Sequence, residues 1–417
     1  MRLIRYMAVI AICVCAYAQS FNSGSTGTDG DFIPPAKVPP GTQLQGNCTP
    51  APGTLLFCTV VVPLREPPNN IYNFGAIDID SGYTVTFQRN LANTPAILLA
   101  TGNVTINGTV DVSGGNGTAP TNPAVPGVPG LGGPGGFNGA AGPVQGAPDQ
   151  IDFTAGLGPG AGGLPGSGSA QASFAAGSTS LDYGIPQLQP LIGGSGGGSF
   201  LNTNISAPGA GGGGALLIAA SGTIDLGPVA TAACAIIANS PGTGSGGAIR
   251  LVATNLTGGR CLSATNASQS ITAAGRIRLE SAQASQYTGT TTPTASTNNP
   301  LFDPPITLFP PVTPTLQIVS IGGVTPPASP TANASTPDVI LPGSTVNVVL
   351  QATHVPSGTA VQILVAPQFG GGPSQIVSGT LTGTVGQPKT ATISVTLPPT
   401  GEGNISAVIR TPFVPEP

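Results

Sequence analysis

The stretch GNVTINGTVDVSGG, residues 102 to 115, carries the feature that most constrains the fold. Its apolar side chains alternate with polar ones, and the alternation runs unbroken through an Asn-Gly pair, at Val104, Ile106, Val110 and Val112. A two-residue hairpin would place Ile106 and Val110 on opposite faces. The pattern therefore predicts either a three-residue bulged loop or a bend at Gly108 that keeps the same side chains inward, as at the corner of a β-solenoid.

The same pattern recurs further along the chain. With Val104 set against Ile224, the run ILLATGNVTINGTVDV matches LLIAASGTIDLGPVATA, so that Ile106 meets Leu226, Gly108 meets Pro228 and Val110 meets Ala230. Proline cannot take the positive φ of a type I′ turn, so the second copy is not a two-residue hairpin. A third copy, AIRLVATNLTGGRCLSA, matches over Ile249, Leu251 and Leu256. Repeats with a constant inward phase predict an all-β fold, a right-handed parallel β-helix of stacked coils.

The residues of these repeats also carry a resemblance. The runs TPAILLATGNVTINGTVDVSGG, GGGGALLIAASGTIDL, GSGGAIRLVATNLTG and GRIRLES, with glycine tracts between them, are similar to a group of uncharacterised exported bacterial glycine-rich proteins. They resemble β-helical surface adhesins more loosely. The resemblance covers about residues 70 to 281, and it implies a β-helical, exported, surface-associated protein.

The N-terminus predicts export. Arg2 and Arg5 precede a short apolar run, and Ala16-Tyr17-Ala18 forms a small-residue cleavage site, so residues 1–18 are predicted to be a signal peptide cut after Ala18. Its removal leaves nine basic against 15 acidic groups, a net charge near −6. This acidity argues against nucleic acid as a partner. No later stretch is apolar enough to cross a bilayer, so we expect no transmembrane segment after cleavage, and a secreted, cell-surface or periplasmic location.

Composition divides the rest of the chain. The sequence holds 63 glycines and 45 prolines and is poor in helix formers, which predicts almost no helix beyond the signal peptide. Residues 19–50 read as an extended leader, and residues 51–281 as the β-helix domain. Within that domain a Gly-rich insertion spans about 116–214. The block lacks the strict every-third glycine of collagen, which indicates irregular low complexity without a core of its own.

A Thr/Pro-rich linker, residues 282–313, leads to a separate module at 314–417. The module contains short alternating runs with turn residues between them: TLQIVSIGG, STVNVVLQATHV, TAVQILVAP, SQIVSGTLTG, TATISVTLP and NISAVIRTPF. These runs predict a β-sandwich. The module resembles the immunoglobulin-like modules of bacterial surface proteins, although it lacks their disulfide and buried tryptophan.

Four cysteines remain after signal cleavage: Cys48, Cys58, Cys234 and Cys261. An even number in an exported chain suggests disulfides, and of the three pairings we favour the local one, Cys48–Cys58 with Cys234–Cys261. A zinc site is disfavoured by the cysteine spacing and by the single histidine, His354. No motif for a cofactor or a metal is present, and His354 is expected to be a solvated loop residue.

Two groups of charged residues are candidate sites. Asp78 and Asp80, in AIDID, project from one side of a strand, and paired carboxylates can act as acid and base in glycoside cleavage. Alternation with Ile77 and Ile79 favours solvent-facing aspartates instead. Arg276, Arg278 and Glu280, in GRIRLES, could bind a polyanion, but a mutually paired, solvated face is favoured.

These expectations favour an exported, non-enzymatic protein with a structural or adhesive role, whose partner is a cell-surface polysaccharide or another surface protein. Two alternatives stay open. One is a polysaccharide lyase or glycoside hydrolase that uses Asp78 and Asp80 on a β-helix scaffold, and the other is a carbohydrate-binding protein.

Overall fold

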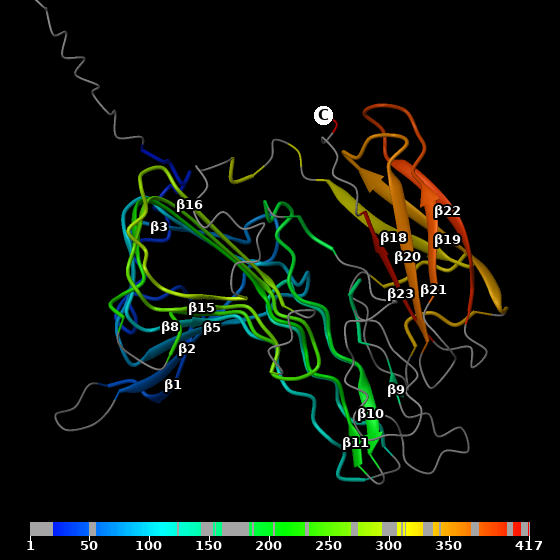
Figure 1. Cartoon of the computed structure of the whole chain (residues 1–417), viewed down its shortest axis with the longest axis horizontal. Coiled ribbons are helices and arrows are strands. Elements are labelled where there is room, and N and C mark those ends of the chain that lie inside the picture. Colours follow the sequence, from blue (N-terminus) through cyan, green and yellow to red (C-terminus); the bar gives the residue numbers. More distant parts are fainter. Residues whose placement is uncertain are drawn as a thin grey trace, which may run out of the picture.

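The fold is all-β. The computed structural model describes residues 20–49, 56–122, 125–142, 153–154, 156–160, 183–185, 187–202, 205–229, 233–267, 274–293, 307–309, 312, 314–327, 337–341, 343–367, 375–397, 403–409 and 416. Among these residues the regular elements are all strands, which confirms the expected class (Figure 1). The predicted signal peptide lies outside the described residues. Within them, no helix has the length and apolar character that a membrane span requires.

Two seven-stranded sheets build the N-terminal part. The strands of sheet 1 all pair in parallel. They are β3 (Ile71–Phe74), β4 (Ile77–Ile79), β6 (Ala96–Ala100), β7 (Val104–Ile106), β12 (Ala215–Asp225), β14 (Ala248–Thr257) and β16 (Arg276–Ser281).

Sheet 2 is also parallel, except for its first strand, which pairs antiparallel. Its strands are β1 (Gln43–Asn47), β2 (Phe57–Pro63), β5 (Tyr83–Gln88), β8 (Thr109–Asp111), β13 (Ile236–Ile237), β15 (Leu262–Ser263) and β17 (Thr291–Thr292). From β2 to β17 the chain alternates between the two sheets, apart from the segment between β8 and β12, and each visit adds a strand beside the previous one. We call this arrangement the stack, and each passage of the chain through its two sheets a coil.

The inward side chains of both sheets form one apolar core. Alternate residues of β2, Cys58, Val60 and Val62, are buried, and the same alternation holds in β5. Aromatic rings lie at the N-terminal end of the core, where Phe74 stacks on both Phe32 and Tyr72. Large aromatic side chains therefore fill this end of the core.

The bend at Asn107-Gly108 takes the chain from one sheet to the other. Strand β7 pairs with β4 and β12 in sheet 1, whereas β8 pairs with β5 and β13 in sheet 2, so both the hairpin and the bulged loop are excluded. Ile106 and Val110 are both 0% exposed. At Gly108 a Cβ atom would lie 2.5 Å from the Asp80 carbonyl oxygen, so the close approach of two coils requires glycine here.

The strand register follows the internal repeat up to the bend. Val104 pairs with Ile224, and the third copy aligns as expected, with Leu251 beside Ile218 and Leu256 beside Ile224. The expected match of Val110 with Ala230 is wrong, because Val110 pairs with Ile236. Extra residues after Pro228 lengthen the second bend, and the sequence offset therefore no longer holds beyond it.

The Gly-rich insertion contains an ordered repeat that the sequence reading missed. Residues 125–142 carry glycine at every third position, so irregular low complexity is wrong for this stretch. Its backbone bonds advance by three residues on both partners: Gly130 N–H donates to Gly209 O and Gly133 N–H to Gly212 O, each at 2.9 Å. Phe137 and Ala140 donate to Gly194 and Gly197 in the same way. Three residues per turn is the repeat of the polyproline II helix.

Glycine is required because these segments touch backbone to backbone. At Gly136 a Cβ atom would lie 2.7 Å from Gly213 O, and at Gly193 it would lie 2.7 Å from the Cα of Gly136. Figure 1 shows the segments running side by side from the stack toward a three-stranded antiparallel sheet of β9 (Phe153–Thr154), β10 (Ser199–Asn202) and β11 (Ile205–Ala207). We call this part the glycine arm; backbone hydrogen bonds, and not an apolar core, hold its described segments together.

The ends of the stack lie in the segments expected to be an extended leader and a Thr/Pro-rich linker. Within the predicted leader, Phe32 is 1% exposed and bridges to Ile77, and β1 pairs with β2. Within the predicted linker, Tyr287 is buried in the core and β17 pairs with β15. Parallel stacking therefore continues beyond residue 281.

The C-terminal module contains the six strands that the sequence predicts: β18 (Thr315–Ile321), β19 (Thr345–Thr353), β20 (Ala360–Pro367), β21 (Gln375–Thr380), β22 (Lys389–Thr396) and β23 (Gly403–Val408). They form two antiparallel three-stranded sheets, β18-β19-β22 and β21-β20-β23. Val348, Ile363 and Ile393 pack in the core between the sheets. The outer face of the second sheet contacts the glycine arm through Leu364, which packs with Tyr183.

Candidate functional site

The predicted carboxylate pair lies on the outside of sheet 1. Ile77 and Ile79 are buried, so Asp78 on β4 projects outward and the exposed Asp80 follows directly after the strand. Burial raises the pKa of Asp78, and the charge of Asp80 adds to the rise. Within the described residues, neither aspartate forms an ion pair with a lysine or an arginine. The positive group that a polysaccharide-cleaving site would need is therefore not brought to them.

A second carboxylate lies in the same row of side chains. Thr105 on β7 pairs with Asp78 on one side and with Asp225 on the other. Because parallel strands are about 4.8 Å apart, the two aspartates are about 10 Å apart across Thr105. Asp225 accepts a 3.0 Å hydrogen bond from the Gly227 amide, which fixes it as part of the turn. The row is acidic and has a threonine at its centre.

The structure keeps Arg278 and Glu280 together as an ion pair, as expected, but separates Arg276 from them. Ile277 and Leu279 point into the core as expected, but Glu280 is 0% exposed and Arg278 is 7% exposed. Arg276 is exposed and donates to Tyr183 O at 3.0 Å. A solvated face is therefore wrong for two of the three residues.

Glu280 belongs to a buried ion cluster. Its Oε1 accepts from Nε of Arg250 and from Nε of Arg278, each at 2.8 Å. The two arginines sit directly opposite on β14 and β16, where like charges repel, and the carboxylate between them offsets that repulsion. Arg250 also donates to Leu308 O at 3.2 Å.

Part of the outer face of sheet 1 is buried because other segments cover it. Leu217 and Val252 pack there with Phe21, Leu191 and Leu308, which come from three distant parts of the chain. This cover removes the ion cluster from water. The cluster of Arg250, Arg278 and Glu280 holds Leu308 of the predicted linker against sheet 1. Its buried charges are not presented to a polyanion on an open surface.

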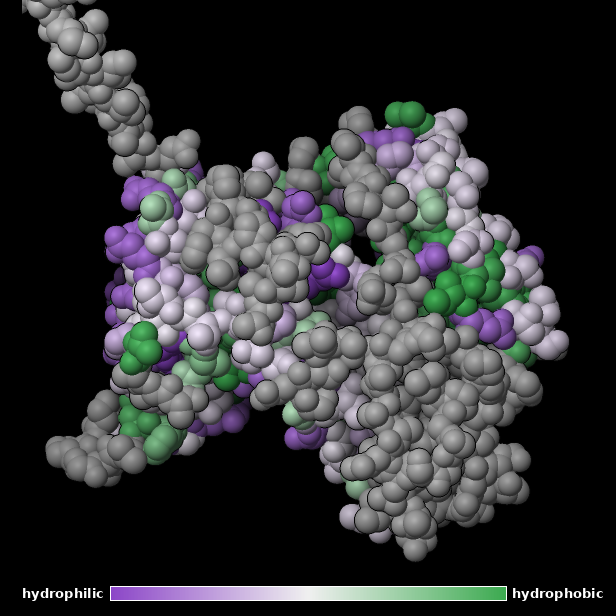
Figure 2. Space-filling model, viewed as in Figure 1, coloured by the Kyte–Doolittle hydropathy of each residue, from purple (hydrophilic) through white to green (hydrophobic). Residues whose placement is uncertain are grey.

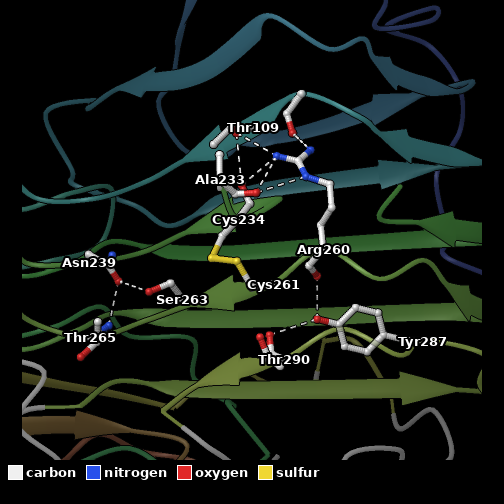
Figure 3. Close-up of a disulfide and its surroundings, with 11 residues drawn as sticks. Thr109, Ala233, Cys234, Asn239, Arg260, Cys261, Ser263, Thr265, Tyr287 and Thr290 are labelled. Carbon is white, nitrogen blue, oxygen red and sulfur yellow. Dashed lines mark hydrogen bonds between the residues drawn. A yellow bond between two sulfur atoms is a disulfide. The ribbon is translucent and has the colours of Figure 1, made fainter. Parts of the chain in front are cut away.

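The most densely bonded cation of the described stack is Arg260, which the sequence reading did not single out (Figure 3). Its guanidinium donates to oxygens of two other coils: Ile106 O, Asn107 O, Gly108 O, Thr109 Oγ1, Ala233 O and Cys234 O. The bond to Asn107 O is 2.6 Å and the bond to Cys234 O is 3.1 Å. Burial lowers the pKa of the Arg260 guanidinium, which nonetheless stays charged because arginine does not lose its proton in proteins.

Arg260 serves a structural role as a buried cation. Among the described residues no carboxylate pairs with Arg260, so backbone carbonyls and the Thr109 hydroxyl satisfy a side chain that is 7% exposed. Arg260 bonds to the bend at Asn107-Gly108 in one coil and to Ala233 and Cys234 in the next, so it joins the two coils. Tyr287 supports it from the next coil, since its hydroxyl donates to Arg260 O at 2.9 Å.

The expected disulfides are both present. Cys234 and Cys261 are joined directly beside Arg260 (Figure 3). Cys48 and Cys58 join the end of β1 to β2. The first bond links two successive coils at the point where Arg260 crosses between them. The two interactions therefore reinforce one corner of the stack.

His354 directly follows β19 in the module and contacts Glu416. Its Nδ1 is 3.0 Å from Glu416 O, and its carbonyl accepts from the Glu416 amide. The Glu416 carboxylate in turn pairs with Lys389, whose side chain is 1% exposed, at 2.7 Å. These contacts fasten Glu416 to the sandwich.

The described residues contain no group of three or more His, Cys, Asp or Glu side chains that could hold a metal ion. Figure 2 shows hydrophilic and near-neutral residues mixed in small areas over the stack, without one continuous strip of either kind. No family model, no curated protein and no solved structure matches this chain. Function has therefore to be argued from its own residues.

Arg250 and Arg260 carry sequence signals that were overlooked. Arg250 interrupts the apolar run AIRLVA, where a charge is costly unless a partner is buried with it. Arg260 directly precedes Cys261 at a predicted corner. A lone cation inside an apolar or turn segment of a repeat is a signal for a structural ion pair or a carbonyl-bound arginine.

Proposed function

We propose that this chain is an exported, non-enzymatic protein with a structural or adhesive role at the cell surface. In this proposal the stack is a right-handed parallel β-helix, the glycine arm is an insertion between its coils, and the C-terminal module is immunoglobulin-like. The alternation of the chain between two parallel sheets supports the β-helix. The two disulfides support a location outside the reducing cytosol.

The observation that carries the proposal is the way the charged groups are used. Arg250 and Arg260 are bound by Glu280 and by carbonyl oxygens, so the buried cations of the stack hold the fold together. Among the described residues, no lysine or arginine forms an ion pair with Asp78 or Asp80, the candidate catalytic pair. Charges that could do chemistry are thus either occupied or lack a partner, which favours a scaffold over an enzyme.

The junction between the parts also suits a scaffold. Tyr183 packs on the outer face of the module, and its hydroxyl donates to Gly193 O at 2.7 Å within the arm. Asn404 on β23 donates to Gly156 O at 3.3 Å. The module is therefore held against the arm by apolar and polar contacts, as display of a binding module at a fixed position requires.

Localisation tests the first half of the proposal. Antibodies against the module should label intact cells that make the protein, and brief protease treatment of intact cells should remove that label. Non-reducing peptide mapping should recover both disulfides. A protein released only by lysis, with free thiols, would contradict export.

Activity tests the second half. The purified protein should release no new reducing or unsaturated ends from neutral or acidic polysaccharides. Cells lacking the protein should lose attachment or surface integrity, and the Asp78→Asn/Asp80→Asn variant should restore it in full. Polysaccharide cleavage that disappears in this variant would overturn the proposal in favour of a hydrolase or lyase.

A further inference from the structure

An apolar ridge runs along the outside of the glycine arm. Val125, Val128 and Leu131 are 49%, 63% and 60% exposed, and they follow one another at intervals of three residues. At about 3.1 Å per residue in polyproline II, neighbouring side chains of the ridge are about 9 Å apart on one side of the helix. Large apolar side chains gathered in this way on a surface mark an interaction site more often than single ones do.

The ridge is held in its conformation by the arm. Gly127 and Gly130 lie on the opposite side and are buried, with Gly127 N–H donating to Gly142 O and Gly130 N–H to Gly209 O. Between them, Val128 N–H donates to Thr118 O at 2.9 Å. The prolines at 126 and 129 fix φ in the polyproline II range. A partner therefore meets a polyproline II helix that is already formed, and little conformational entropy is lost on binding.

The chemistry of the ridge selects the kind of partner. Prolines 126 and 129 have no N–H, so a further strand or glycine segment cannot add to this edge by a ladder of hydrogen bonds. No charged residue occurs between positions 112 and 148, so an ionic partner has nothing to pair with. What the ridge presents is two Val-Pro dipeptides spaced by three residues, followed by a leucine.

We propose that this ridge is the ligand of a groove lined with aromatic side chains on a partner protein. Such grooves accept successive apolar-proline dipeptides of a polyproline II helix in adjacent pockets. The described part of a second copy of this chain does not supply one, since the exposed aromatic side chains within it are the separate Phe57 and Phe309. This inference goes beyond the proposed scaffold role and assigns the arm a partner.

The absence of tryptophan from this chain makes a direct test available. The probes are purified SH3 domains, whose grooves carry a tryptophan, titrated with the full-length protein. We expect a saturable change in tryptophan fluorescence that persists at high salt, because no charge contributes. The same domains with the groove tryptophan replaced by alanine should not retain the protein on a biosensor surface.

Matched variants make the test specific. Val125→Ser/Val128→Ser should weaken binding at least about tenfold, since each valine buries apolar area in a pocket. Val229→Ser/Val385→Ser, at positions 74% and 73% exposed but outside the ridge, should bind as the unaltered protein does. Both variants change exposed side chains, and equal melting temperatures would show that both are folded.

Two outcomes would overturn the proposal. The first is the absence of saturable binding to any of the domains, or binding that the ridge variant retains. The second is concentration-dependent self-association that Val125→Ser/Val128→Ser removes, measured by sedimentation velocity. That result would make a second copy the partner of the ridge.

Discussion

The Asn103 side chain accepts a 2.9 Å hydrogen bond from the amide of Thr223, which lies 120 residues later in the chain. The two residues occupy equivalent places in two copies of the internal repeat, one on each side of the Gly-rich insertion. The insertion therefore leaves the register of sheet 1 unchanged. The strands of the first and second copies pair directly, although the insertion separates them in the sequence.

The bend at Asn107-Gly108 predicts how charged substitutions at two core positions affect stability. Ile106→Asp and Val110→Asp should both abolish cooperative unfolding, because each places a charge without a partner in the core, at a cost of several kcal/mol. Circular dichroism during thermal denaturation would measure both. A mild effect at Val110 would contradict inward side chains on both sides of the bend.

The acidic row on sheet 1 gives Thr105 an unusual sensitivity to charge. Thr105→Lys should stabilise the fold by about 0.2–1 kcal/mol, and Thr105→Asp should destabilise it by a similar amount, because Asp78 and Asp225 flank this position. Both effects should fade at about 1 M salt, where charges are screened over about 3 Å.

The control for this experiment is Thr59, which lies between Gln45 and Thr84 in sheet 2. Thr59→Lys and Thr59→Asp should differ little in free energy of unfolding, as measured by urea denaturation. Equal effects of the two Thr105 variants would show that the flanking carboxylates do not act on this position.

Arg260 should be among the residues of the stack most sensitive to substitution. Arg260→Met keeps the apolar stem but leaves several carbonyl oxygens without their donor, and each buried unsatisfied group costs about 1–3 kcal/mol. We expect a loss of at least about 3 kcal/mol in the free energy of unfolding. Arg276→Met, which removes an exposed guanidinium, should stay within about 0.5 kcal/mol. A similar loss in both variants would argue against a special role for the carbonyl-bound cation.

Two glycines of the arm differ in the space around them, so their substitution tests whether close backbone packing requires glycine. At Gly133 a Cβ atom would lie 2.6 Å from Gly214 N, whereas at Gly115 the nearest atom would be 3.6 Å away. Gly133→Ala should therefore cost about 1–3 kcal/mol through overpacking, and Gly115→Ala should be neutral or slightly stabilising. Limited proteolysis of the arm, read by mass spectrometry, would detect the difference. Equal protection of both variants would contradict backbone contact at Gly133.

Two aspartates should affect the pH dependence of stability in opposite directions. Burial tends to raise the pKa of Asp29, but hydrogen bonds from Arg65 and from the Asn73 amide outweigh it and lower the pKa below the ordinary 3.8. The ionised Asp29 therefore adds stability above pH 3.8, and this contribution is lost as the pH falls through the lowered pKa. Asp29→Asn should be less stable than the unaltered protein near neutral pH, and the difference should vanish in acid.

Asp78 has the reverse linkage, because its pKa in the folded state is raised. Its charged form opposes folding above that pKa, so Asp78→Asn should be more stable near neutral pH, and the gain should disappear below about pH 3.8. Urea denaturation across this pH range would measure both variants together. Shifts of the same sign would contradict the environments seen in the structure.

The parts of the fold that follow a two-residue alternation could be predicted from the sequence. The six strands of the module, the inward set Val104, Ile106 and Val110, and the local disulfides were all read correctly, since each depends on neighbours along the chain. The period of three in residues 125–142 is also present in the sequence. It is not apparent when the whole Gly-rich block, about 116–214, is considered together, because the glycines outside this stretch do not keep that spacing.

What the sequence could not supply depends on distant partners. The acceptors of Arg260 come from residues 106–109 and 233–234, so its role emerges only when coils lie side by side. Burial of Arg278 and Glu280 depends on cover by Phe21, Leu191 and Leu308, which come from distant parts of the chain. The local sequence around Arg278 and Glu280 does not indicate that these residues will cover them. Alternation placed these charges on the outer side of the strand correctly, but it could not show that this side is itself covered.

The glycine arm gives one chain two different responses to temperature. Unfolding the stack exposes apolar surface, which raises the heat capacity, whereas unfolding the arm exposes mainly peptide groups, which lowers it. Hydrophobic stabilisation weakens on cooling, so the stack loses part of its driving force in the cold. The arm, joined by hydrogen bonds between backbones, does not share that loss. Near freezing, the arm and not the apolar core is the part whose cohesion is best preserved.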